Sequence, residues 1–259
     1  MQIPSFLTTL ALSLSSFSAA LSLPPRASTQ AAAAKPPYFI LTGDSTVAVN
    51  GGWGDGFLTF LADSADGVNG GKSGATTVSF RANGRWDAVL DGIADHAADY
   101  EPIVTIQFGH NDQKSTSGIS LEQFGENLQN LANEVIEAGG TPIIITSLTR
   151  RNFEGSAVIE NLADHSAKAI EAAEAVGVQY LDLNRASTDY VNAIGEENAH
   201  TYDLSSGDGT HLNTAGETVF GRLVADLLLE KRDDLEEFFT PNEELSRKLK
   251  DGEYAAGDE

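Results

Sequence analysis

Apolar residues gather in short runs that alternate with longer stretches of helical periodicity. Four apolar runs predict strands, at residues 38–42, 103–108, 142–146 and 178–181. Four periodic stretches predict helices, at residues 56–64, 121–138, 157–176 and 214–237. Strands separated by helices indicate βαβ units, so we expect an α/β domain with a parallel sheet.

The best-defined helix covers residues 121–138, where apolar side chains recur mostly at steps of three and four. Ser120 precedes it as a candidate N-cap, and Gly139-Gly140 ends it. The run Ile143-Ile144-Ile145 is typical of a strand covered on both faces.

The N-terminal 20 residues carry no charged side chain and end in Ser18-Ala19-Ala20, which is similar to a signal-peptidase cleavage site. We predict a secretory signal peptide at 1–20 and a secreted protein. The alternative, a membrane anchor, needs about 20 apolar residues, more than this run contains. Residues 21–37, rich in Ala, Ser and Pro, are interpreted as a flexible leader before a catalytic domain at 38–240.

The formal net charge is −22, which should repel nucleic acid and anionic membranes. Length favours one domain, and we expect a monomer. The chain contains no cysteine, which excludes disulfides and thiolate zinc sites. Acidic residues are dense after Lys231-Arg232, and we interpret residues 241–259 as an acidic tail with a disordered terminus.

Polar segments follow the predicted strands or lie on loops beyond them: 43–46, 69–74, 109–112 and 208–211. Parallel strands bring their carboxyl ends to one edge of a sheet, so these segments can meet there. In the last segment, Asp208 and His211 are spaced so that one turn supplies an imidazole base and the carboxylate that orients it. Ser45, directly after the first predicted strand, is the hydroxyl that this base would activate. Taken singly, Ser45 could cap a helix, and Asp208 could stabilise an Asx turn.

Together, these segments resemble the SGNH hydrolases, or GDSL-type esterases, whose Ser, Gly, Asn and His would be Ser45, Gly71, Asn111 and His211. The chain is most similar to the rhamnogalacturonan acetylesterases. That similarity rests on residues 43–46, 52–55, 84–86, 107–112 and 208–212 and spans roughly residues 38 to 230.

The resemblance implies a three-layer α/β/α, flavodoxin-like fold with a five-stranded parallel sheet in the order 2-1-3-4-5. It also implies a catalytic triad of Ser45, Asp208 and His211, with no cofactor and no metal. Oxyanion donors would be the N–H groups of Ser45 and Gly71 and the Asn111 amide. The expected activity is deacetylation of plant cell-wall pectin, with rhamnogalacturonan first, through an acetyl-enzyme.

The second segment departs from the family, because Lys72 stands where an arginine is usual. Its spacing leaves Gly70 and Gly74 as alternatives to Gly71. Trp53, Lys72 and His110 are candidate substrate contacts. Trp53 and Trp86 could instead be core residues, and His110 could be a structural neighbour of the site.

Five basic residues could bind uronate carboxylates or simply be exposed: Lys72, Arg81, Arg85, Arg150 and Arg151. His96, His165 and His200 are expected to have no role. His110 and Asp112 could ligate a metal, but no third ligand is spaced to join them.

Two other functions compete with this hypothesis. One is an esterase acting on acetylated xylan, another glycan or a lipid-like acyl ester. The other is a non-catalytic carbohydrate-binding protein on the same fold, which would not need a serine, an aspartate and a histidine together.

Overall fold

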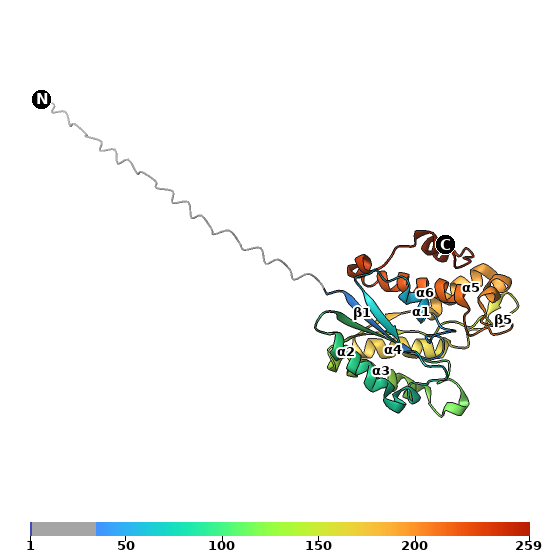
Figure 1. Cartoon of the computed structure of the whole chain (residues 1–259), viewed down its shortest axis with the longest axis horizontal. Helices are drawn as coiled ribbons and strands as arrows, with labels where there is room; N and C mark the ends of the chain where they lie inside the picture. The colour runs from blue at the N-terminus through green and yellow to red at the C-terminus, as the bar shows by residue number, and fades with distance from the viewer. Residues whose placement is uncertain (2–34) are drawn as a thin grey trace. The chain divides into compact units, whose positions relative to one another are not determined.

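The computed structural model describes Met1 and residues 35–259 (Figure 1). The predicted signal peptide after Met1 and the predicted leader up to residue 34 lie outside the described residues. Of the predicted leader, residues 35–37 are described, and Pro37 begins the first strand.

The central sheet has five parallel strands in the order β2-β1-β3-β4-β7, which confirms the predicted order 2-1-3-4-5. Its strands are β1 (Pro37–Gly43), β2 (Asp66–Asn69), β3 (Glu101–Gln107), β4 (Thr141–Ile145) and β7 (Gln179–Leu181). In the register of β1 and β3, Gly43 lies opposite Gln107. The segments after these two strands therefore leave the sheet side by side.

Helices cover both faces of the sheet (Figure 1). One face carries α1 (Gly54–Leu58), α5 (Leu183–Ala199) and α6 (Thr214–Leu229), and the other carries α2 (Arg85–His96), α3 (Leu121–Glu137) and α4 (Ala163–Val176). Successive strand residues point to opposite faces, so Phe39 and Leu41 join one hydrophobic core and Ile40 joins the other. The predicted three-layer α/β fold is confirmed.

Several predicted bounds were wrong. Residues 157–158 form β6 (Ala157–Val158), which pairs antiparallel with β5 (Phe153–Glu154), so α4 begins only at Ala163. The helix predicted at 214–237 is two elements, α6 and the 3₁₀ helix η4 (Asp233–Phe238). The helix predicted at 56–64 lies earlier and is shorter, as α1. Among the remaining elements are three further 3₁₀ helices: η1 (Ser79–Gly84), η2 (Ser115–Ser117) and η3 (His200–Tyr202).

The C-terminal segment 241–259 is ordered, so the prediction of a disordered terminus was wrong. It contains α7 (Glu243–Asp251), whose Leu245 is fully buried. Ala255 is also fully buried, and its carbonyl accepts a hydrogen bond of 2.6 Å from the Tyr202 hydroxyl. A few apolar positions among the acidic ones are enough to pack this segment on the domain. Within residues 35–259, no helix is both long and apolar enough to cross a bilayer.

Candidate active site

Ser45 lies in a tight turn directly after β1, which we call the serine turn (residues 43–48). Its neighbour Asp44 is fully buried, and Asp44 Oδ1 accepts hydrogen bonds from the N–H (2.9 Å) and hydroxyl (2.8 Å) of Thr46. The Val47 and Ala48 N–H groups donate to the Asp44 carbonyl. These local bonds fix the backbone on both sides of Ser45.

A buried amide also supports the serine turn. Gln107, the last residue of β3, donates to the Thr46 hydroxyl (2.6 Å) and accepts from the Trp53 indole N–H (2.8 Å). Trp53 is fully buried. The prediction that Trp53 contacts substrate was therefore wrong, because its ring has no exposed face on which a sugar could stack.

His211 and Asp208 lie where the sequence pattern predicted, within reach of Ser45. His211 Nε2 is 2.9 Å from Ser45 Oγ, and His211 Nδ1 is 2.9 Å from Asp208 Oδ2. The His211 and Asp208 side chains are 33% and 26% exposed, so the group of three is open to a substrate. This order of contacts is the one a hydroxyl, a base and an orienting carboxylate require.

The local backbone holds Asp208 in its ionised form. Its Oδ1 accepts the N–H groups of Thr210 (3.1 Å) and His211 (3.0 Å). Partial burial by itself raises the pKa of Asp208, but the hydrogen bonds from His211 and Thr210 outweigh it and hold the pKa below its ordinary value. The Asp208 carboxylate thus forms both the Asx turn that the sequence suggested and the contact with the His211 ring.

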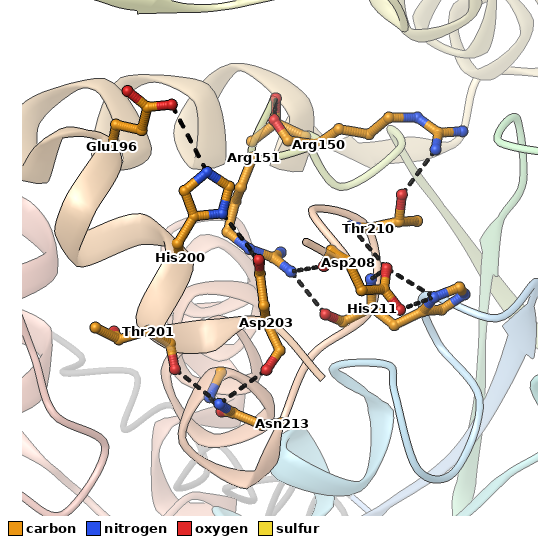
Figure 2. Close-up of polar contacts among 12 residues, drawn as sticks. Arg150, Arg151, Glu196, His200, Thr201, Asp203, Asp208, Thr210, His211 and Asn213 are labelled. Atoms are coloured by element: carbon orange, nitrogen blue, oxygen red, sulfur yellow. Dashed lines mark hydrogen bonds and ion pairs between the residues drawn. The ribbon is translucent and has the colours of Figure 1, made fainter. Parts of the chain in front are cut away.

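A buried arginine holds the loop that carries Asp208 and His211, which we call the histidine loop (residues 203–211). Arg151 is fully buried, and its guanidinium donates to the Asp203 carboxylate (2.9 Å). It also donates to the carbonyls of Asp208 (3.2 Å) and His211 (2.6 Å), as Figure 2 shows. Both alternatives considered for Arg151, a cation that binds a uronate and one that is simply exposed, were therefore wrong.

Asn111 contributes a fixed amide to the same edge of the sheet. Its Nδ2 donates to the Ala75 carbonyl (2.9 Å), and its Oδ1 accepts from the Lys114 ammonium (2.7 Å). An ammonium must bond to oxygen, so Lys114 fixes which end of the amide is the donor. The second Nδ2 hydrogen is left for another acceptor.

Among the three glycines considered, Gly71 is the one packed against the serine turn. A Cβ at Gly71 would lie 2.5 Å from the Ala48 nitrogen, whereas one at Gly74 would meet nothing within 4 Å. The Gly70 N–H is bonded to the Leu41 carbonyl, while the Gly71 N–H bonds the Asn69 side chain at 3.1 Å. Asn69 also donates to the Val47 carbonyl, so it ties the glycine segment to the serine turn. The N–H groups of Gly70 and Gly71 both have partners, so it is the packing of Gly71 against the serine turn that favours it.

His110 and Asp112 lie behind the site. His110 is 3% exposed, and its Nδ1 is 3.6 Å from Asp44 Oδ2, beyond hydrogen-bond length. The predicted contact of His110 with substrate was wrong, because neither ring nitrogen is accessible. Asp112 is fully buried and accepts from the Thr77 N–H and hydroxyl. Among residues 35–259, no three His, Cys, Asp or Glu side chains are grouped to hold a metal ion.

The remaining predicted residues are outside this group. Lys72 is exposed, so it stays available as a predicted substrate contact. Trp86 is buried and donates to Glu134, which also pairs with Arg81. His200 was expected to have no role, but its Nδ1 lies 2.8 Å from Asp203 Oδ2, at the far end of the Arg151 network (Figure 2).

Sequence reasoning missed the supporting contacts of Gln107, Asn69, Lys114 and Asp203. Gln107 and Asn69 end their strands, so a polar side chain at a strand end was the available signal. Lys114 and Asp203 carry no such signal, because their partners are set by loop conformation.

The comparisons with known proteins agree with this geometry. Residues 41–219 match the GDSL-like lipase/acylhydrolase family. Rhamnogalacturonan acetylesterase RhgT of Bacillus subtilis is 32% identical over 212 residues, which cover 74% of this chain and 89% of RhgT. The probable rhamnogalacturonan acetylesterase YesY of the same organism is 28% identical over 201 residues, covering 73% of this chain and 90% of YesY.

Solved structures show the same fold. The crystal structure of protein YxiM from Bacillus subtilis matches with a TM-score of 0.67 and 24% identity, covering 79% of this chain and 59% of that one. This chain therefore spans about three fifths of the length of YxiM. Axe2, an acetylxylan esterase from Geobacillus stearothermophilus, matches with a TM-score of 0.55 and 17% identity, covering 76% of this chain and 94% of Axe2. Because residues 41–219 are more than half of this chain, the chain belongs to the GDSL-like lipase/acylhydrolase family.

Proposed function

We propose that the protein is a serine esterase that removes acetyl groups from plant cell-wall pectin, with rhamnogalacturonan as its first substrate. The observation that carries the proposal is the continuous set of contacts from Ser45 Oγ through the His211 ring to the Asp208 carboxylate. Family membership supports an ester hydrolase.

In the proposed mechanism, His211 Nε2 takes the Ser45 proton as Oγ attacks the acetyl carbon. Asp208 accepts the Nδ1–H of the imidazolium that forms, which fixes the ring and stabilises its charge. The tetrahedral intermediate collapses to an acetyl-enzyme when the imidazolium returns its proton to the departing sugar hydroxyl. Water then releases acetate by the same route.

The oxyanion needs donors that are oriented before the reaction. We propose the N–H groups of Ser45 and Gly71 and the second Nδ2 hydrogen of Asn111. The Gly71 N–H, which donates to Asn69 Oδ1 at 3.1 Å in the free protein, would share its hydrogen with the oxyanion or turn toward it. Lys114 supports this role, because its charge holds the Asn111 oxygen and polarises the amide toward donation. Each such donor contributes about 3–4 kcal/mol in comparable enzymes.

The substrate choice rests on the relatives. RhgT, at 32% identity, is named a rhamnogalacturonan acetylesterase. The alternative, an esterase for acetylated xylan, is favoured by the fold similarity to Axe2, which is named an acetylxylan esterase. An acetate-release screen on acetylated rhamnogalacturonan, acetylated xylan and long-chain acyl esters separates them, and we expect rhamnogalacturonan to react fastest. Faster release from xylan would reject the substrate and keep the mechanism.

A second test addresses the alternative of a non-catalytic carbohydrate-binding protein. An organophosphate should form a covalent adduct at Ser45, detected by mass spectrometry of the Ser45 peptide. Folded protein that gains no adduct there would favour a binding protein.

We also propose that the protein is secreted and monomeric, from its sequence. N-terminal sequencing of protein from the culture medium should find cleavage close to Ala20. Light scattering should give the mass of one chain.

A further inference from the structure

Two consecutive arginines follow β4, and they use their donors differently. Arg151 is buried in contacts within the fold. Arg150 is half-buried and makes one side-chain hydrogen bond within residues 35–259, from Nη1 to the Thr210 hydroxyl at 2.8 Å. Its Nε is buried without a partner there, and no carboxylate of that part of the chain is within 4.0 Å of its guanidinium.

Arg150 lies beside the candidate active site. Its hydrogen-bond partner Thr210 is the residue before His211. In Figure 2 the Arg150 side chain extends in the same direction as the His211 ring, whereas Arg151 turns back toward Asp203. The charges of Asp44 and Asp208 act on Arg150 from beyond ion-pair distance. Arg150 is therefore a cation bonded to the residue next to the proposed base.

This guanidinium is incompletely paired in a protein that has 38 acidic and 16 basic residues. Partial burial lowers its pKa from the ordinary value, which means that its charge is poorly solvated. The planar fork of an arginine matches a carboxylate, and the two groups form the strongest hydrogen bonds available to side chains. A neutral sugar would leave the charge without a counter-ion.

We propose that Arg150 binds the carboxylate of an acidic sugar, a uronate next to the acetylated position. This inference rests on the proposed function and deepens it, because it assigns the discrimination between acidic and neutral glycans to one side chain. Arg150 would also give a strongly acidic protein a cation with which to meet a polyanion at this site.

The experiment compares wild type, Arg150→Gln and Arg247→Gln. Arg247 is the matched control, because it is an exposed arginine of α7 whose guanidinium pairs with acidic residues of its own segment. The substrates are acetylated rhamnogalacturonan oligosaccharides, the same oligosaccharides with their uronates reduced to neutral sugars, and 4-nitrophenyl acetate. A separate measurement uses galacturonate and galactose as inhibitors of 4-nitrophenyl acetate hydrolysis.

For Arg150→Gln we expect the ratio of kcat/KM on the acidic substrate to kcat/KM on 4-nitrophenyl acetate to fall about tenfold or more. Reduction of the substrate's carboxyl groups should lower kcat/KM of wild type by a similar factor. It should lower kcat/KM of Arg150→Gln little further. Galacturonate should inhibit wild type better than galactose, and Arg150→Gln should lose this difference. Arg247→Gln should behave as wild type.

Two outcomes overturn the inference. One is an equal loss on all substrates, which would make Arg150 a support of Thr210. The other is equal inhibition of wild type by galacturonate and galactose. Failure of the proposed function would look different, because wild type would then release acetate faster from xylan. In that case the inhibition experiment still decides whether Arg150 binds a carboxylate.

Discussion

The serine turn and the histidine loop meet at one hydrogen bond, but they are held in different ways. The serine turn follows β1 directly, and Asp44 at its centre is fully buried and bonded to residues within the turn. The histidine loop contains exposed residues at 204–207 and depends on Arg151, which lies 52 positions from Asp203 and 60 from His211. The serine turn is thus fixed mainly by local bonds, to which Gln107 adds a distant one, whereas a single distant side chain joins three residues of the histidine loop.

Two kinds of substitution can therefore be distinguished: those that remove a reacting group and those that move it out of position. Changes at the reacting atoms should have the largest effects in either half. Changes one contact away should matter more in the histidine loop, because Arg151 alone joins Asp203, Asp208 and His211. The supports of the serine turn are divided among Asp44, Gln107 and Asn69.

The largest effect is expected from Ser45→Ala, which removes the proposed nucleophile without disturbing the bonds of Asp44. Activity on 4-nitrophenyl acetate should fall about 10⁴-fold or more, with an unchanged circular dichroism spectrum. Ser64→Ala, at an exposed serine away from the site, is the control and should keep its activity. Substantial turnover by Ser45→Ala would end the nucleophile assignment and with it the comparison of the two halves.

The next effect is expected from Arg151→Lys. Lysine keeps a charge for Asp203 but lacks the planar fork that reaches two carbonyls as well. We expect kcat to fall about 10- to 100-fold with little change in KM, because His211 is misplaced while substrate contacts remain. Arg151→Met should also lose about 3–5 kcal/mol of unfolding free energy, since it breaks a buried ion pair and leaves the His200 ring as the side-chain partner of Asp203, which is 5% exposed.

Gln107→Met is the matched change on the other side, because it removes the buried amide below the serine turn. It should lower stability by about 1–3 kcal/mol, since it leaves the Trp53 N–H unpaired. Its effect on kcat should be smaller than that of Arg151→Lys. A larger kcat effect for Gln107→Met would show that the serine turn is the more fragile half.

The same difference explains how much the sequence could predict. The position of Ser45 follows from a strand end, whereas the sheet order and the role of Asn111 were implied by the resemblance to the family. The structure brings Ser45 and His211 within 2.9 Å and has the implied strand order. Arg151 was considered as a uronate-binding or an exposed cation but not as a buried one, because burial of a charge depends on partners more than 50 positions away. Trp53 was placed at the cleft although it is core, since an aromatic residue near a motif fits either place.

The hydrophobic pattern also could not predict short polar elements. β2 is the edge strand Asp66–Asn69, whose side chains are exposed or half-buried, so it has no apolar run. The C-terminal segment was interpreted from its charge, whereas Leu245 and Ala255 decide where it packs. Average composition says little about a segment that is held by a few buried positions.

The pH dependence of activity tests whether the histidine loop keeps its structure while it loses its function. The pKa of Asp208 is held below its ordinary value, so its stabilising contribution is present above the unfolded value of about 3.9 and is lost only as pH falls through the lower folded value. Above that value the loop keeps the ionised Asp208, so the loss of one general base should stop the reaction without loss of the loop's structure. We expect log kcat/KM to fall with a slope of one as pH decreases, reversibly and with an unchanged circular dichroism spectrum. A slope of two, or unfolding in the same range, would mean that the loop loses its structure together with its function.

The smallest effect is expected from Tyr202→Phe, which loosens the start of the histidine loop from the C-terminal segment. The Tyr202 hydroxyl donates to the Ala255 carbonyl at 2.6 Å and contacts the Tyr190 hydroxyl at 2.9 Å, and all three groups are buried. Its removal leaves a buried carbonyl unpaired and should cost about 1–3 kcal/mol of unfolding free energy. Hydrogen exchange should quicken in residues 203–211 and stay unchanged in residues 43–48. Tyr254→Phe removes only a 3.2 Å contact of an exposed hydroxyl and is the control, expected to change stability by less than about 0.5 kcal/mol. Equal quickening of exchange in both segments would mean that the two halves of the site open as one unit, and that the distant supports of the histidine loop also hold the serine turn.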